Sequence, residues 1–243
     1  MAMIRGTKAD DIIEVLRKIP DSWRRKVQEV TLDMAANMNL VVQKCFREAK
    51  RVIDRFHVQR LACDAVQEIR IKYRWQALDE ENEQIKKARA AKTDFSPEVL
   101  ENGDTLKQLL ARSRYLLFKH KDKWTTSQKQ RACLLFERYP RLKQAYDLSF
   151  KLGIIYRNCT SWQHAYKKLA LWYQEVEMSG IESFRTVSKT LETHYEPILN
   201  FFNNRSTNAS AESFNAKIKA FRASSRGVRD IPFFLFRLAN IYA

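Results

Sequence analysis

The sequence predicts an α/β protein in which helices dominate, and three observations lead to this fold class. Two short runs rich in β-branched residues, 27–32 and 50–54, have the length and composition of strands. Apolar residues recur at helical spacing between the two runs. They do so again from about residue 58 to residue 203. We therefore expect a β-α-β unit followed by a long helical body.

The N-terminal elements follow from local patterns. Asp10 and Asp11 begin an apolar series at helical spacing that Pro20 helps to end, so this acidic pair is expected at a helix start rather than in catalysis. A loop leads from this helix to the first strand. A helix over about residues 34–46 separates the strands, which favours parallel pairing and brings Asp33 and Asp54 to the same edge of the sheet. Open α/β sheets build their sites at this carboxyl edge.

The helical body contains one clear interruption. Its first apolar stripe runs into the polar residues 79–87, which we interpret as a solvated helix end. Residues 92–104, with Pro97 and Gly103, are predicted to form a loop or flexible linker. Gly180 is expected to separate two later helices. The helix before Gly180 carries an aromatic stripe that we expect in the core, with base stacking as the alternative: Trp162, Tyr166, Leu169, Tyr173 and Val176.

Composition favours a polyanionic partner. Lys and Arg number 44 against 28 Asp and Glu, which gives a formal net charge of +16 and favours nucleic acid. No apolar stretch reaches the roughly 20 residues of a membrane span, and no signal peptide is recognisable, so we expect a cytoplasmic protein. The cysteines form no C-x-x-C pair and are predicted to be reduced core thiols: Cys45, Cys63, Cys133 and Cys159.

A helix over about residues 209–222 combines two distinct rows. Turn and capping residues at 203–208 introduce it. One row is apolar and is expected to be buried: Ala211, Phe214, Ile218 and Phe221. The second row lies about 110° around the axis, at 100° per residue, and comprises Glu212, Asn215, Lys219 and Arg222. It suits one metal ion and a phosphate backbone, although a solvated polar face with a Glu-Lys pair has the same spacing.

Three local strings, in order along the chain, carry a family resemblance. They are EVTLDMAANM at 29–38, VIDRFHV at 52–58 and NASAESFNAKIK at 208–219. Together they resemble the bacterial insertion-sequence transposases of the ISL3 family. The resemblance implies a partial RNase H-like catalytic domain that carries a large all-helical insertion. It divides the chain into a partial core at 1–58, the insertion at 59–205, and closing helices at 206–243.

The resemblance also implies site residues. Asp33 matches the second Asp of an Asp-Asp-Glu triad and Glu212 matches its Glu, so both are expected to be catalytic metal ligands. Asp54 and His57 match an Asp-x-x-His signature and are expected to organise the site. We prefer Asp33 to Asp54 as the ligand because its strand lies nearer the centre of the implied fold. The residues expected to bind the DNA backbone are Lys217, Lys219, Arg222, Arg226 and Arg229.

The implied chemistry is DNA cleavage and strand transfer with Mg²⁺ or Mn²⁺, and intact relatives are expected to be homo-oligomers. The family's first catalytic Asp lies on an upstream strand, and the short segment before Asp33 shows no such strand. We therefore expect a truncated, inactive copy that also lacks the zinc-finger-like and helix-turn-helix regions for transposon ends.

Two other function classes explain part of the sequence. A non-catalytic basic helical protein that binds nucleic acid would account for the charge, and a metal-dependent nuclease would use the same carboxylates without strand transfer. A zinc site built from Asp54, His57 and Cys63 lacks a fourth ligand at suitable spacing.

Overall fold

The computed structural model describes residues 6–242, and these divide into two compact units. Unit 1 combines Met1–His57 with His194–Ala243, and unit 2 is Val58–Thr193. The predicted insertion, residues 59–205, overlaps unit 2 but also includes a helix that belongs to unit 1. None of the described helices is both long enough and apolar enough to cross a bilayer.

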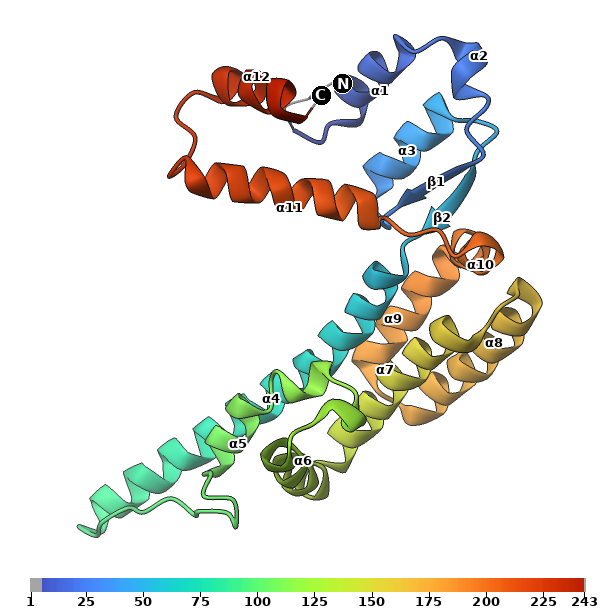
Figure 1. The fold of residues 1–243 in the computed structure, drawn as a ribbon. Helices are drawn as coiled ribbons and strands as arrows, with labels where there is room; N and C mark the ends of the chain where they lie inside the picture. The colour runs from blue at the N-terminus through green and yellow to red at the C-terminus, as the bar shows by residue number, and fades with distance from the viewer. Residues whose placement is uncertain (1–5, 243) are drawn as a thin grey trace. The chain divides into compact units, whose positions relative to one another are not determined.

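Unit 1 is built around a small parallel sheet (Figure 1). Its elements are α1 (Ala9–Arg17), α2 (Asp21–Arg24), β1 (Glu29–Leu32), α3 (Ala36–Cys45), β2 (Lys50–Ile53), α10 (Tyr195–Asn204), α11 (Ala209–Ser224) and α12 (Ile231–Tyr242). The strands pair in parallel, with Leu32 opposite Ile53, so the predicted β-α-β unit is confirmed. The first strand is two residues shorter than predicted. The short helix α2 replaces part of the predicted loop.

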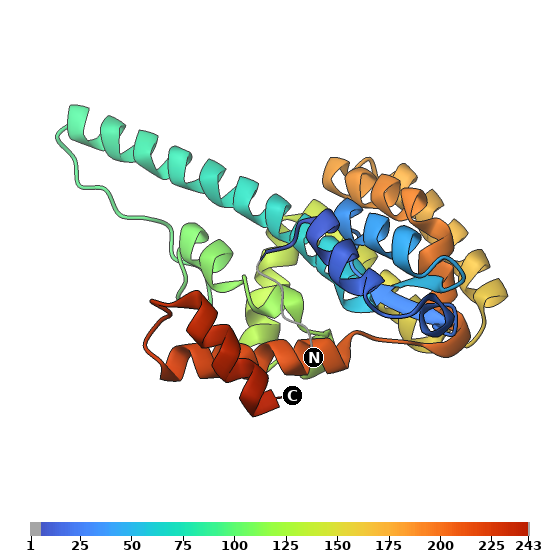
Figure 2. The ribbon, with the colours of Figure 1, turned by 90° about the horizontal axis from the view of Figure 1, so that it is seen from above.

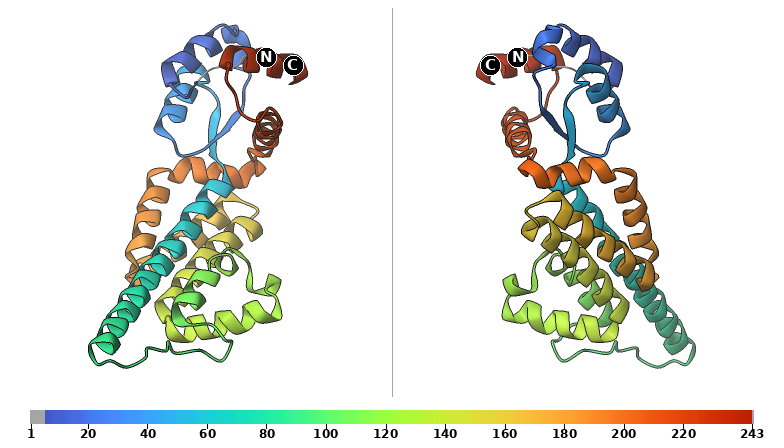
Figure 3. Two further views of the ribbon diagram at one scale, coloured as in Figure 1. Left: turned by 90° about the vertical axis from the view of Figure 1, so that its left-hand side faces the viewer. Right: turned by 90° about the vertical axis from the view of Figure 1, so that its right-hand side faces the viewer.

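The sheet is covered from several elements of unit 1. Val52 and Ile53 are fully buried in β2. The helix α10 lies against β2 (Figure 3). Nδ2 of Asn200 donates a hydrogen bond of 3.0 Å to the carbonyl of Arg51. The helices α1 and α3 pack side by side through Ile13, Val41 and Cys45 (Figure 2). Asp10 and Asp11 lie in the first turn of α1, as predicted, where carboxylates favour the helix dipole.

The apolar row of α11 is less buried than predicted. No residue of α11 is fully buried, and Phe214, Ile218 and Phe221 are only half-buried. Phe221 stacks on Phe234 of α12, with ring centroids 5.4 Å apart. The prediction of a buried row was wrong because spacing identifies an apolar face without showing how much structure covers it.

Unit 2 is helical throughout, apart from its loops. Its elements are most of α4 (Arg55–Ala90), α5 (Leu106–Arg112), the 3₁₀ turns η1 (Leu116–Phe118) and η2 (Lys121–Lys123), α6 (Thr126–Arg138), α7 (Pro140–Asn158), α8 (Trp162–Ser179) and α9 (Glu182–Thr193). Its core includes Trp172, whose indole N–H donates to the carbonyl of Leu148 at 2.9 Å. Gly180 ends α8 in the left-handed conformation with φ of 61°, as predicted.

Two predictions about unit 2 side chains need correction. Trp162 and Tyr166 are 46% and 48% exposed, so the aromatic stripe of α8 is only partly in the core. Cys133 is exposed and Cys63 half-buried, whereas Cys45 and Cys159 are buried thiols. Both predictions relied on helical spacing, which identifies an apolar face of a helix. The exposed residues lie at the edge of such a face, where solvent reaches them.

The predicted loop at 92–104 ends in a buried polar cluster. The carboxylate of Asp104 is fully buried and bonds to the guanidinium groups of Arg112 and Arg131, the latter at 2.8 Å. Burial alone raises the pKa of Asp104, but hydrogen bonds from Arg131 and Arg112 outweigh it and hold the pKa below its ordinary value. This carboxylate therefore ties the loop to α5 and α6.

Candidate active site at the carboxyl ends of the strands

Asp33 and Asp54 follow paired positions of the sheet. Leu32 and Ile53 are register partners, and each aspartate is the next residue of its strand. Neighbouring strands lie about 4.8 Å apart, so the two aspartates leave the sheet at the same edge. The structure therefore brings together the two strand-end carboxylates that the sequence singled out.

Asp33 is half-buried and has one oxygen committed to its own turn. Its Oδ1 accepts a hydrogen bond of 2.9 Å from the backbone N–H of Ala35. This local turn leads the chain from β1 into α3. Among residues 6–242, no donor to Oδ2 of Asp33 is found.

Asp54 is fully buried, and both of its oxygens accept backbone hydrogen bonds. Oδ1 accepts from the N–H of Phe56 at 2.7 Å, which caps the start of α4. Oδ2 accepts from the N–H of Asn208 at 2.6 Å, and Asn208 is the N-cap residue of α11. A single carboxylate thus joins the end of β2 to the beginnings of two helices.

A second carboxylate, which sequence reasoning missed, holds the segment between α10 and α11. Oε1 of Glu29 accepts from Nδ2 of Asn204, and Oε2 accepts from Oγ of Ser206, both at 2.6 Å. Glu29 is the first residue of β1, and its place in the predicted strand does not by itself indicate this contact. The sequence signal that could have indicated this contact is weak. It consists of an acidic residue in a predicted strand and, far along the chain, the polar turn residues 203–208.

Glu212 lies in the first turn of α11 and is exposed. It is four residues beyond Asn208, about 6 Å along the axis at 1.5 Å per residue. Since Asp54 fixes Asn208, the start of α11 is anchored at the carboxyl edge of the strands (Figure 1). Within the part of the chain described, Glu212 forms no salt bridge.

His57 follows the capping turn of Asp54. Its backbone N–H donates to the carbonyl of Asp54 at 3.1 Å, and the side chain is half-buried. Its Nδ1 is buried and finds no hydrogen-bond partner among the described residues. His57 is thus close to Asp54 through the backbone, while its ring makes no polar contact with that carboxylate.

The predicted DNA-binding cations follow Glu212 along α11 and the turn after it. All five are exposed, and none forms a salt bridge with another residue of the described range: Lys217, Lys219, Arg222, Arg226 and Arg229. Arg226 and Gly227 have φ of 49° and 110°, which reverses the chain after α11. These charges remain available to an external anion.

The donors at this edge suit a hard divalent cation by type but do not enclose one. Asp33 and Glu212 each have carboxylate oxygen free of protein partners, and oxygen is what such cations prefer. Within residues 6–242, however, no three His, Cys, Asp or Glu side chains converge on a point that could hold a metal ion. Asp54 is the least available because it is fully buried and each of its oxygens already accepts one hydrogen bond.

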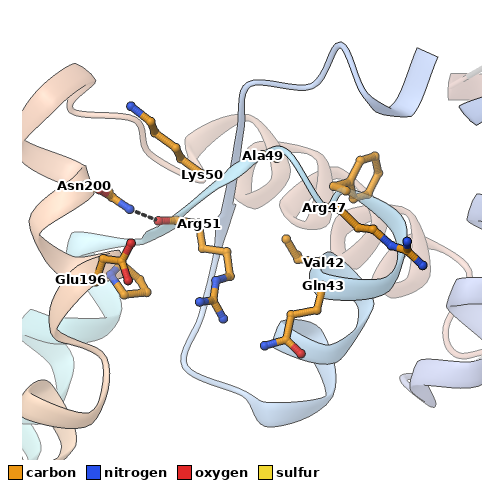
Figure 4. A pocket seen from close by; sticks show the side chains of 10 residues that line it. Val42, Gln43, Arg47, Ala49, Lys50, Arg51, Glu196 and Asn200 are labelled. Carbon is orange, nitrogen blue, oxygen red and sulfur yellow. Dashed lines mark hydrogen bonds between the residues drawn. The ribbon is translucent and has the colours of Figure 1, made fainter. Parts of the chain in front are cut away.

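The opposite end of β2 carries a cavity of different character. Its volume is about 360 Å³, and it lies between α3, the start of β2 and α10 (Figure 4). Arg47, Lys50 and Arg51 contribute cations and Glu196 the carboxylate. Since Lys50 and Arg51 begin β2 whereas Asp54 follows its end, this cavity is separate from the carboxylate edge.

Comparisons with known proteins find similarity to transposases. A family model described as a transposase of the ISL3 type matches residues 1–238. The chain is also 22% identical over 228 residues to a Bordetella parapertussis protein described as "Transposase for insertion sequence element IS1001". That alignment covers 91% of this chain and 49% of the relative, so the chain spans about half the length of the curated relative it matches. No solved structure is similar to the chain.

Proposed function

Because the chain belongs to the ISL3 family of transposases, we propose that its function is DNA transposition and that it supplies part of a site for metal-dependent cleavage and strand transfer of an insertion sequence. Asp33 and Glu212 are the proposed catalytic metal ligands. Asp54 and His57 are the proposed site-organising residues. The unit that contains the two strands is the proposed RNase H-like core, and unit 2 accounts for most of the proposed insertion.

One observation carries this proposal. The hydrogen bond from Asn208 to Asp54 places the start of α11 at the edge where β1 and β2 end. Asp33 is on that edge, and Glu212 is one turn into α11. The proposal is supported by this arrangement, because a metal-dependent phosphoryl-transfer site uses carboxylates that come from separate parts of the sequence.

The chain's own residues supply distinct parts of the chemistry. Asp33 and Glu212 provide the oxygens that would hold a hard divalent cation, with Mg²⁺ or Mn²⁺ the proposed ion. When bound, such an ion neutralises charge on the scissile phosphate and lowers the pKa of an attacking hydroxyl. Asp54 holds the end of β2 next to the start of α11. A phosphoryl-transfer site depends on such positioning of its groups.

The exposed cations of α11 are the proposed contacts to DNA backbone phosphates. Lys219 is seven residues from Glu212, so both lie on one side of the helix, and Arg222 is less than one turn further on. A phosphate backbone lying along this face would therefore pass the Glu212 carboxylate. The formal net charge of +16 supports the same partner.

The test is whether two distant carboxylates share one divalent cation. Mn²⁺ binding is measured by calorimetry for the wild type, Asp33→Asn and Glu212→Gln, with the exposed Glu14→Gln of α1 as the matched control. We expect both site variants to weaken binding by at least tenfold and the control to bind as the wild type does. Fe²⁺ with peroxide should also cleave the backbone near residues 33 and 212 in the same molecule.

Assays with DNA distinguish a loss of catalysis from a loss of DNA binding in the same variants. Duplex carrying insertion-sequence ends is the substrate, and Glu212→Gln should retain binding to it while losing any Mg²⁺-dependent cleavage. If Mn²⁺ binding is unchanged in both site variants, the carboxylate assignment is wrong. Unaltered DNA binding without metal dependence would then favour a non-catalytic role.

A further inference from the structure

Unit 2 carries a groove that the proposed catalytic chemistry does not use. It encloses about 670 Å³ against α4 and the segment that follows α5. We call it the Arg70 groove and define it by Arg70, Arg74, Trp75, Arg114 and Phe118. All of these residues belong to one compact unit, so the groove is a feature of unit 2 alone.

Three guanidinium groups gather in the Arg70 groove without an acidic partner. Arg70 is 4% exposed, and it donates to Oε1 of Gln67 at 2.7 Å and to the carbonyl of Leu110 at 2.8 Å. Burial lowers the pKa of Arg70, and the nearby positive charges of Arg74 and Arg114 lower it further. The three cations therefore repel one another, and an anion bound among them would relieve that repulsion.

The acidic residues on the rim do not neutralise these cations. Asp64 and Glu68 also line the groove, but the carboxylate of Asp64 pairs with Arg60 at 3.6 Å. Among residues 6–242, none of the three groove arginines forms a salt bridge. The lining of the groove therefore carries a net positive charge, and the cavity has room for a phosphate.

Exposed aromatic rings stand beside the cations. Trp75 is 63% exposed and adjoins Arg74, and Phe118 is 45% exposed. Tyr115 is 67% exposed, with the guanidinium carbon of Arg114 5.4 Å from its ring centroid. Aromatic faces interleaved with cations are the arrangement by which proteins hold unpaired nucleotides, since bases stack on the rings and phosphates meet the charges.

We infer that the Arg70 groove binds an unpaired segment of nucleic acid, with a base stacked on Trp75 and the flanking phosphates on Arg74 and Arg114. Arg70 is the fixed cation at the floor of the groove, since its hydrogen bonds to Gln67 and Leu110 hold the guanidinium in place. Bases inside a duplex are already stacked, so they cannot reach Trp75. An apolar protein segment fits less well, because it would desolvate three like charges without compensation.

This inference rests on the proposed function only in taking DNA as the polymer. The experiment measures binding of the full chain to a labelled 12-nucleotide single strand and to a duplex of the same length by fluorescence anisotropy. Trp75→Ala should weaken single-strand binding by about 5- to 150-fold, the range for loss of one stacked base. Trp75→Phe should restore most of that loss, and duplex binding should change less than twofold in both variants.

The matched control is Trp162→Ala, which removes another exposed tryptophan from the same unit. It should leave both affinities unchanged. A strand of abasic sugars should bind wild type and Trp75→Ala equally, because it offers nothing to stack. Arg74→Gln and Arg114→Gln should each reduce the salt slope of single-strand binding by about 0.7.

Equal single-strand affinity of the wild type and Trp75→Ala would overturn the inference, as would a loss of the same size for duplex. Trp75 is mostly exposed, so its removal leaves the fold intact, which thermal unfolding can verify. Trp75→Ala should bind Mn²⁺ as tightly as the wild type does, because Trp75 belongs to unit 2 and the proposed metal ligands belong to unit 1. Failure of the catalytic proposal and failure of this inference are therefore separately visible.

Discussion

Replacement of Asp54 by alanine tests the contact on which the candidate site depends. The carboxylate is fully buried and accepts from the N–H groups of Phe56 at 2.7 Å and Asn208 at 2.6 Å. A hydrogen bond to a charged group contributes about 1.5–3 kcal/mol, and two are lost together. We expect Asp54→Ala to lower the free energy of unfolding by about 3–6 kcal/mol, a large part of a typical total of about 5–15.

Asp54→Asn should lie between the wild type and alanine. Its single carbonyl oxygen can accept from one of the two N–H groups, but its amide then faces the other donor. The matched control is Asp230→Ala, which removes an exposed carboxylate that caps α12 by accepting from Phe233 at 3.0 Å. We expect Asp230→Ala to lower the free energy of unfolding by about 1 kcal/mol, the usual loss when an N-cap residue is replaced by alanine.

Two assays distinguish this contact from general destabilisation. Urea unfolding gives the free energies, and hydrogen exchange with mass spectrometry follows the amides of residues 206–212. In Asp54→Ala these amides should lose protection even in conditions where the fold persists, because Asn208 no longer has its acceptor. Unchanged exchange at 206–212, with a loss no larger than that of Asp230→Ala, would refute the anchoring argument.

Three further outcomes follow from the described contacts. Asp104→Asn should cost about 1.5–3 kcal/mol near neutral pH, because the charged bond to Arg131 is lost. Since the pKa of Asp104 is lowered in the folded protein, the ionised carboxylate stabilises the wild type above about pH 4. This stabilisation is lost as pH falls through the folded pKa, so the free energies of unfolding of the wild type and Asp104→Asn should converge in acid. The double change Arg226→Gln and Arg229→Gln should reduce the salt slope of duplex binding by about 1.8, and an unchanged slope would remove these cations from the interface. A thiol reagent should modify the exposed Cys133 first, and prior reaction of a buried cysteine would contradict the packing.

The sequence predicted the elements whose signals are local. Strand composition and helical spacing located β1, α3 and β2, and the helix between the strands predicted their parallel pairing. The turn residues before Ala209 located the start of α11. These features depend on neighbours a few residues apart, which a single sequence displays directly.

What the sequence did not reveal depends on contacts between distant segments. The bonds from Glu29 to Asn204 and Ser206 span most of the chain, and nothing in the local pattern of β1 indicates them. The clustering of Arg70 with Arg114 was missed for the same reason. Helical spacing also led us to expect too much burial at Trp162, because an apolar face does not show which of its residues other helices cover.

The two strand-end aspartates are alike in sequence but differ in what their oxygens can do. Asp54 is fully buried and each of its oxygens already accepts a backbone N–H bond, so it is poorly placed to meet an external cation. Asp33 is half-buried and commits only one oxygen, to Ala35, which leaves the other for an external ligand. The two aspartates therefore suit different roles, one in holding the scaffold and the other in meeting an external group. That difference supports the proposed division of roles, with Asp54 positioning the helix that carries Glu212 and Asp33 facing the substrate.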